Sequence, residues 1–250
     1  MILYSVAEGI ARITLNRPEK RNALNPELIA ALKESLEASA KDEMVRAVLI
    51  TGAGKDFCSG MDLASLDRTA DAGVLDHLET ARNLADLFLA MRHHPRPLVA
   101  AVKGRALAGG CGVATACDLI LAAESAQFSY TEVNIGFVPA IVMAILRRSV
   151  SEKRAFELIA TGEVITAAEA CSMGMINRVY TDAEFEANVE RYAASLAAKP
   201  ASAVSLSKNL LYHTDAMTFE AAIEAGVHGN ALARMTEEAR RGIERFVKKN

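Results

Sequence analysis

The sequence has no tryptophan and few other aromatic residues. Phe, Tyr and Trp together make up 5% of its 250 residues. Surfaces that bind single-stranded nucleic acid stack the bases on aromatic side chains, so this composition argues against such a surface. The 28 basic and 31 acidic side chains give a formal net charge of −3, which provides no overall attraction to nucleic acid or to an anionic membrane. We therefore expect no nucleic-acid partner.

Long apolar runs are also missing. The longest stretch without a charged residue, 133–146, is too short to cross a bilayer and contains Gly136 and Pro139. Residues 1–10 show no basic region followed by an apolar one, so no secretion signal is visible. We expect a cytoplasmic protein that has no membrane partner.

Cysteine is scarce, and its spacing does not indicate a metal site. None of the four cysteines belongs to a C-x-x-C pair, and none has a histidine partner at the spacing of a zinc site. We interpret them as reduced, buried thiols and expect no metal. The four are Cys58, Cys111, Cys117 and Cys171.

What the sequence does contain is an alternation of strand and helix patterns. With 51% apolar and 24% charged residues, a chain of this length can bury a substantial core. Asn25, Pro26 and Glu27 form a helix start, and Thr166 with Glu169 forms a capping box. Strands are expected at 2–6, 10–15, 45–51, 98–102 and 118–123, and helices at 26–40, 74–91, 106–117, 138–150 and 151–161.

The last part of the chain, from Asp182 onward, is almost entirely helical in pattern. The order of elements predicts an α/β core over residues 1–195 and a C-terminal helical region over 196–250. The tail pattern is amphipathic, so its apolar residues pack either on the same core or on another subunit. The sequence alone leaves both arrangements open.

Two glycine-containing turns could supply backbone hydrogen-bond donors. The turn Gly60-Met61-Asp62 and the turn at Ala108-Gly109 each follow a strand and lead into a helix. Such a turn leaves N–H groups without partners, and two of them aimed at one point form an oxyanion hole. Taken alone, each turn is more often a purely structural use of glycine.

The sequence completes none of the familiar nucleotide-binding and serine-hydrolase motifs that we compared with it. Residues 104–109 have the glycine spacing of a P-loop, but Gly110 and Cys111 stand where lysine and serine or threonine are needed. The chain has neither a G-x-G-x-x-G fingerprint nor a G-x-S-x-G nucleophile elbow. Phosphate-loop and serine-hydrolase chemistry are therefore not expected.

Six segments carry a resemblance to a known family when they are taken together. They are residues 16–24, 57–63, 104–112, 116–118, 126–132 and 136–139. In this order they resemble the enoyl-CoA hydratase/isomerase (crotonase) superfamily, over about residues 10 to 180. No single segment is specific, but the ordered set is. The resemblance implies a crotonase-like spiral of ββα units and a C-terminal helical trimerisation region.

The resemblance implies an acyl-CoA thioester as substrate, with an enolate formed at its carbonyl group. The N–H groups of Met61 and Gly109 would be the two oxyanion donors. Coenzyme A would lie along residues 20–24 and 59–63, with Lys20 and Arg21 near its phosphates, although a solvated basic turn explains those two equally well. The implied substrate-binding residues are Lys20, Arg21, Ala23, Leu24, Ser59, Gly60, Asp62, Leu63 and Gly112.

The same resemblance implies a homotrimer or homohexamer and no cofactor apart from the coenzyme A of the substrate. Two aspartates within the matching segments are expected to have structural tasks. Asp62 is expected to cap the helix that follows it, and Asp118 to act at the start of a strand.

One position departs from the family pattern in a way that affects the chemistry. Hydratases of this family generally hold water between two glutamates, and the second of these maps onto Glu132. The first maps onto Gly112, twenty residues earlier, and is therefore missing. We expect Glu132 to act as acid and base, and we expect the glycine to enlarge the pocket for a bulky acyl group.

Three functional hypotheses remain after this step. The first is an enoyl-CoA hydratase, in which Glu132 acts alone or with a further polar group. The second is a double-bond isomerase with Glu132 as sole proton shuttle, and the third is an acyl-CoA-binding protein without efficient turnover. The sequence does not rank the further polar candidates, which are Tyr130, Asn134, His77 and Glu79.

Overall fold

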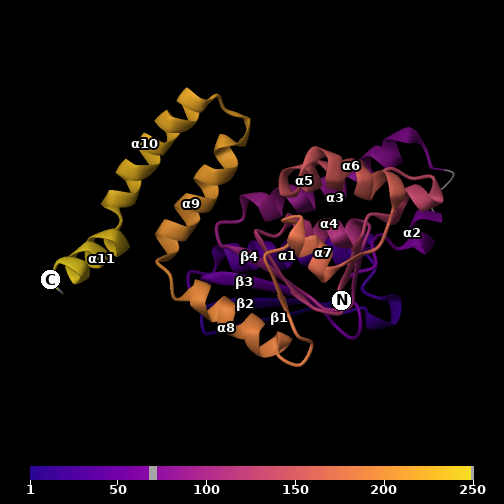
Figure 1. The fold of residues 1–250 in the computed structure, drawn as a ribbon, viewed down its shortest axis with the longest axis horizontal. Coiled ribbons are helices and arrows are strands. Elements are labelled where there is room, and N and C mark those ends of the chain that lie inside the picture. The colour runs from indigo at the N-terminus through magenta and orange to yellow at the C-terminus, as the bar shows by residue number, and fades with distance from the viewer. Residues whose placement is uncertain (68–71, 249–250) are drawn as a thin grey trace.

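The computed structural model describes residues 1–67 and 72–248 and contains a six-stranded main sheet (Figure 1). The first two strands form the expected antiparallel hairpin, with Ile2 opposite Leu15, and the others run parallel. The strand order is β1 (Ile2–Ala7), β2 (Ile10–Leu15), β3 (Ala47–Gly52), β4 (Leu98–Val102), β6 (Leu119–Ala123) and β9 (Arg178–Tyr180).

A second, three-stranded sheet was not expected from the sequence. It consists of β5 (Arg105–Leu107), β7 (Gln127–Ser129) and β8 (Ile165–Thr166). The helix predicted over 106–117 is therefore wrong at its start, because α4 spans only Gly109–Ala116. A strand of three residues is too short to show the alternation that distinguishes it from a helix.

Helices cover both faces of the main sheet. Successive side chains of a strand point to opposite faces, and here both sets are apolar, so both faces need a cover. In β4, Leu98, Ala100 and Val102 belong to the larger core cluster, under α1 (Pro26–Lys41), α3 (Val74–His93) and α4. Val99 and Ala101 face the opposite way and pack with α8 (Phe185–Ala197). These strands are apolar on both faces because both faces are buried.

The remaining short elements connect these layers. Helix α7 (Ala167–Ser172) begins with the predicted capping box, in which the Thr166 hydroxyl accepts from Glu169 N–H while the Glu169 carboxylate accepts from Thr166 N–H. The elements are η1 (Pro18–Lys20), α2 (Leu63–Asp67), η2 (Thr131–Ile135), α5 (Ala140–Ser149), α6 (Glu152–Thr161) and α7 (Ala167–Ser172).

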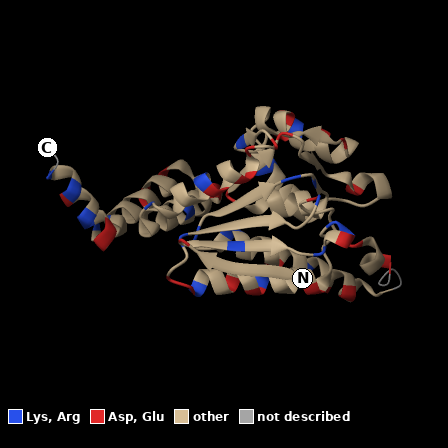
Figure 2. Ribbon diagram, turned by 90° about the horizontal axis from the view of Figure 1, so that it is seen from below, with Lys and Arg blue, Asp and Glu red and all other residues tan. Residues whose placement is uncertain are grey.

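The C-terminal helices form an arm that leads away from the sheets (Figure 1). The arm comprises α9 (Ala201–His213), η3 (Thr214–Ala216), α10 (Phe219–Met235) and α11 (Glu237–Val247). Charged residues of both signs are spread along the helices, whereas the strands carry few (Figure 2). Large apolar side chains of the arm are nevertheless exposed, including Phe219, Ile223, Val227, Ile243 and Phe246. The division of the chain at residue 195 stays a prediction.

The described residues contain neither a helix long and apolar enough to span a bilayer nor a metal-binding cluster of His, Cys, Asp and Glu. The four cysteines are free thiols. Three of them are buried as expected, and Cys171 is half-buried.

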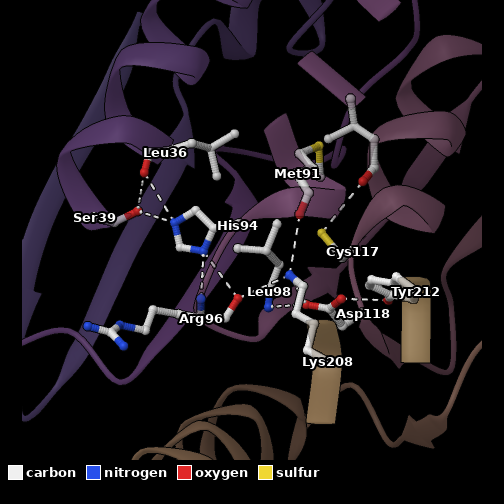
Figure 3. A network of polar contacts seen from close by, with 11 residues as sticks. Leu36, Ser39, Met91, His94, Arg96, Leu98, Cys117, Asp118, Lys208 and Tyr212 are labelled. Atoms are coloured by element: carbon white, nitrogen blue, oxygen red, sulfur yellow. Dashed lines mark hydrogen bonds and ion pairs between the residues drawn. The ribbon is translucent and has the colours of Figure 1, made fainter. Parts of the chain in front are cut away.

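The first helix of the arm is attached to the core by buried charge. Lys208 is the one residue of α9 that is buried, and its Nζ lies 2.7 Å from Oδ2 of Asp118 (Figure 3). It also donates to the carbonyl groups of Met91 and Arg96. The other oxygen of Asp118 accepts from the Tyr212 hydroxyl at 2.6 Å. Asp118 Oδ2 also accepts from Leu98 N–H at the start of β4, so its predicted structural task is confirmed.

A second ionic group holds the end of the same helix. Asp215, in η3, pairs with Arg92 of α3 and with Arg148 of α5. The guanidinium of Arg92 also lies 4.1 Å from the centre of the Tyr212 ring, which is a cation–π distance. Ion pairs, rather than apolar packing of α9, thus position the start of the arm, which we call its root and which comprises α9 and η3.

We predict that Lys208→Met lowers the free energy of unfolding by about 3 kcal/mol, because it leaves the Asp118 carboxylate buried without its cation. Urea unfolding followed by circular dichroism measures this loss. Lys199→Met, at an exposed lysine just after α8, is the matched control and is expected to change stability by less than about 0.5 kcal/mol. Equal losses in the two variants would contradict the assignment.

Candidate active site

The two predicted donor turns lie against each other in the structure. A Cβ added at Gly60, where φ is +93°, would lie 2.9 Å from Leu107 O and 3.4 Å from Gly109 N. A Cβ added at Gly109 would lie 3.9 Å from Met61 N. Glycine at position 60 is therefore required both by its backbone angle and by the close approach of the second turn. The main chain near Met61 and near Gly109 forms one continuous surface.

The N–H groups of Met61 and Gly109 donate to no group among the described residues, whereas the chain around them is fixed. On one side, Leu24 N–H donates to Gly60 O and Asp62 N–H donates to Leu24 O, both at 2.8 Å. On the other side, Ala108 N–H donates to Ser129 O at 2.8 Å. Gly109 is also the first residue of α4, where the helix dipole favours negative charge.

Ala108 holds the second turn in a strained conformation. Its φ of +48° and ψ of −127° lie in a region that non-glycine residues rarely adopt. Such strain costs about 1–3 kcal/mol and persists where surrounding bonds impose it. Here the bond from Ala108 N–H to Ser129 O and the bond from Gly112 N–H to Ala108 O impose it.

The two segments expected to bind coenzyme A lie side by side. Ser59 N–H donates to Arg21 O at 3.0 Å, next to the bonds that join Leu24 to Gly60 and Asp62. Lys20 and Arg21 are exposed, whereas Ala23 and Leu24 are buried. Leu63 is exposed, and Ser59 is half-buried.

Buried polar residues that the sequence reasoning missed hold this pair of segments together. The Asn22 side chain donates to the carbonyl groups of Ala53 and Asp56, and it accepts from Arg17 N–H. The Asp56 carboxylate in turn binds the guanidinium of Arg105 at 2.9 Å. Asn22 lies within a segment that carried the family resemblance, but nothing in one sequence marks it as buried.

Asp62 has partners within the fold. Its carboxylate pairs with Arg17 at 3.0 Å, and it accepts from Ala64 N–H at 3.2 Å, so the expected cap of α2 is confirmed. The hydrogen bond from Arg17 is the main cause that holds the pKa of Asp62 below its usual value. This carboxylate therefore stays ionised and paired.

Glu132 differs from these acids. It lies in η2 directly after β7, and its Oε2 atom is buried without a hydrogen-bond partner among the described residues. Burial raises the pKa of Glu132 above that of an ordinary glutamate. Its charge contributes to the high pKa of Cys111, in the first turn of α4, although burial is the larger cause there. The acid thus lies near the helix that begins at Gly109.

The other polar side chains that could assist Glu132 in acid–base chemistry are placed less favourably for that role. Tyr130 is buried, and its hydroxyl lies 3.1 Å from Oγ1 of Thr115, which joins η2 to α4. His77, Glu79 and Asn134 are exposed. Tyr130 therefore positions the segment that carries Glu132, and none of the three exposed side chains shares the burial of that carboxylate.

The space beside Gly112 is filled, which corrects the expectation of an enlarged pocket. A Cβ added at Gly112 would lie 2.3 Å from Cγ1 of Val142 and 3.2 Å from Cζ of Phe88. Val142 belongs to α5 and Phe88 to α3, and both are buried. The absence of a side chain at position 112 is thus compensated by apolar groups from two neighbouring helices.

With this geometry established, comparison with known proteins identifies the family. The enoyl-CoA hydratase/isomerase family matches residues 5–250. The chain belongs to this family. A Thermus thermophilus protein provisionally named enoyl-CoA hydratase is 39% identical over 248 residues, which cover 99% of this chain and 98% of that protein.

Two other proteins similar to this chain are named as an isomerase and as a hydratase. The 1,2-epoxyphenylacetyl-CoA isomerase of Escherichia coli is 31% identical over 99% of this chain and 95% of its own length. The crystal structure of an enoyl-CoA hydratase from Mycobacterium smegmatis has a TM-score of 0.95 and 33% identity, and covers 100% of this chain and 96% of that one. The mixed α/β fold with a helical C-terminal region is therefore that of crotonase-fold proteins.

We predict that Gly60→Ala lowers the free energy of unfolding by about 2–4 kcal/mol, because it combines a positive φ with a clash against the second turn. Thermal or urea unfolding measures the change. The matched control is Gly226→Ala in α10, where an added Cβ meets nothing within 4 Å. That helical site is expected to keep or gain stability, and a similar loss at both sites would contradict the close approach.

Proposed function

We propose that this protein binds an acyl-CoA thioester and stabilises its enolate through the N–H groups of Met61 and Gly109. The observation that carries the proposal is the pair of adjoining turns, each with an amide that has no partner in the described chain. Negative charge grows on the thioester oxygen when a proton leaves the neighbouring carbon. A fixed donor at that oxygen typically contributes about 2.7–4 kcal/mol to the transition state.

We propose Glu132 as the acid and base. Its raised pKa and the free Oε2 atom suit a group that accepts and returns a proton. Asp56 and Asp62, the acids nearest the Met61 turn in sequence, and Asp118, the acid nearest the Gly109 turn, are all engaged in ion pairs. A single free carboxylate suffices to carry one proton between two carbon atoms of the same substrate.

The reaction that this arrangement supports best is migration of a double bond. Glu132 takes a proton from C2 of a 3-enoyl-CoA, and the dienolate charge on the thioester oxygen is held by the two amides. The same carboxylic acid then returns the proton to C4, which gives the 2-enoyl-CoA. Water takes no part, so no second carboxylate is required at position 112.

Hydration of a 2-enoyl-CoA is the second candidate. The names of the Thermus and Mycobacterium relatives favour it. The chemistry would use the same two amides and Glu132, but a water molecule would have to be held beside C3. The apolar contacts of Val142 and Phe88 with Gly112 provide no polar group for that purpose.

We propose that coenzyme A lies along residues 20–24 and 59–63. The exposed Lys20 and Arg21 suit its phosphates, and the hydrogen bonds between the two segments keep them in register. Gly60, Asp62 and Leu63 belong to the same surface. The substrate brings its own coenzyme A, and no further cofactor is proposed.

We also propose that the arm joins copies of this chain into a trimer or a hexamer in the cytoplasm. The exposed Phe219, Ile223 and Val227 recur at four-residue spacing along one face of α10, which is typical of a helix that packs on a partner. Light scattering coupled to size exclusion would show a mass three or six times the 26.8 kDa of one chain.

An absorbance assay separates the candidates. The purified protein is given a 3-enoyl-CoA, crotonyl-CoA and a branched 2-enoyl-CoA, and the absorbance of the conjugated thioester is followed. A gain with the first substrate supports isomerisation, and a loss with either of the others supports hydration. Binding of the thioesters without any change would support the hypothesis of a protein that does not turn them over.

We predict that Glu132→Gln lowers kcat by about two to four orders of magnitude, the usual contribution of general acid–base catalysis. The amide keeps the shape of the side chain but cannot take up the proton. Glu163→Gln, at an exposed glutamate, serves as the control. A rate for Glu132→Gln close to that of the wild type would exclude Glu132 from the mechanism.

We predict that kcat/KM falls on the acidic side of an apparent pKa above that of an ordinary glutamate. Proton abstraction needs ionised Glu132, and burial favours its protonated form, so activity is lost as the pH drops through this raised pKa. A pH–rate profile of the wild type measures it. The residual activity of Glu132→Gln should lack this acidic limb.

A further inference from the structure

Two apolar side chains fill the space beside Gly112, and Val142 makes the closer contact. Gly112 follows the donor Gly109 by three residues in α4, so the two lie on one face, about 4.5 Å apart along the helix axis. If the thioester oxygen is bound at Gly109 N, C2 and C3 of the acyl group extend within reach of Gly112. Whatever covers Gly112 therefore contacts these carbons.

Val142 covers Gly112. Its Cγ1 atom would lie 2.3 Å, and its Cβ atom 3.2 Å, from a Cβ at position 112, and only 3% of Val142 is exposed. A β-branched residue in a helix has essentially one side-chain rotamer, so the isopropyl group cannot rotate away. Leu146, one turn further along α5, is fully buried and fixes the same face of the helix.

The segment that carries Val142 also carries Glu132. Phe137 N–H donates to Glu132 O at 3.0 Å, and Met143 N–H donates to Pro139 O at 2.9 Å. The first bond closes the turn at the end of η2 and the second lies in the first turn of α5, so only Val138 separates the two bonded turns. The acid–base group and the apolar cover are therefore placed by one continuous piece of chain.

We propose that Val142 is the specificity-determining residue of this site, because it keeps water away from C3 so that the 2-enoyl-CoA formed by double-bond migration is released without being hydrated. The inference rests on the proposed function and assigns to Val142 the choice between double-bond migration and hydration. Val142 and Phe88 present only carbon atoms to the volume at Gly112, so a water molecule there would lack the partners it needs.

The decisive experiment changes polarity while keeping shape. Val142→Thr replaces one methyl group by a hydroxyl of similar size, which can hold a water molecule beside C3. We expect the ratio of hydrated to isomerised product from a 3-enoyl-CoA to rise at least about tenfold in this variant, since one placed polar group commonly changes specificity by that factor or more. Product analysis by chromatography measures the ratio.

Val189→Thr is the matched control. Val189 is also a buried valine in a helix, but it lies in α8 on the opposite face of the sheet. We expect its product ratio to equal that of the wild type. A ratio that stays at the wild-type value in Val142→Thr, or a wild-type enzyme that already forms mainly hydrated product, would overturn the role of Val142.

A double-mutant cycle tests the contact between Gly112 and Val142 without any measurement of turnover. Gly112→Ala should lower the melting temperature, whereas the same change in a Val142→Ala background should lower it much less, because the truncated side chain leaves room for the new methyl group. Equal shifts in both backgrounds would show that Val142 does not fill the volume.

The outcomes also separate this proposal from the function on which it rests. A wild-type protein that converts no enoyl-CoA thioester overturns both the proposed function and the role of Val142 in it, even if the melting temperatures show the contact. Turnover with unchanged product ratios overturns only the role of Val142.

Discussion

Direct contact between two stretches of main chain is the constraint on which the site depends. Residues 55–60 lie so close to residues 104–110 that a Cβ at Gly104 would lie 2.0 Å from Lys55 O and one at Gly110 would lie 2.3 Å from Cys58 O. Without side chains between them, the two backbones bring Met61 and Gly109 to one surface. The second sheet supports this contact, because β5 leads straight into the turn and pairs with β7, which leads to Glu132.

The acids around this surface fall into two kinds. Asp56 and Asp62 are ion-paired, and their pKa values are lowered mainly by hydrogen bonds from arginine. Glu132 is half-buried with one oxygen lacking a partner in the described chain, and its pKa is raised by burial. The first kind stabilises the fold in its ionised form. The second retains the capacity to exchange a proton, so the distinction between scaffold and reactive group follows from partners rather than from residue type.

Sequence reasoning located the long elements well and the short ones poorly. The hairpin, the helix capped by Asn25 and the capping box at Thr166 were predicted because each depends on local chemistry. Strands β5, β7, β8 and β9 have two or three residues each and left no periodic signal. The two donor turns could be proposed from glycine spacing and family resemblance. The filling of the space at Gly112 could not, because Val142 lies 30 residues away in sequence and reaches it only through the packing of α5 on α4.

The ionic attachment of α9 has a consequence for the rest of the arm. The root of the arm is fixed by polar contacts of Lys208, Tyr212 and Asp215. The apolar faces of α10 and α11 therefore remain exposed instead of packing on the core of the same chain. A helix whose root is already oriented loses less conformational freedom when it meets another surface. In the proposed assembly the arm is thus preorganised, and part of the entropic cost of docking it is met when the single chain folds.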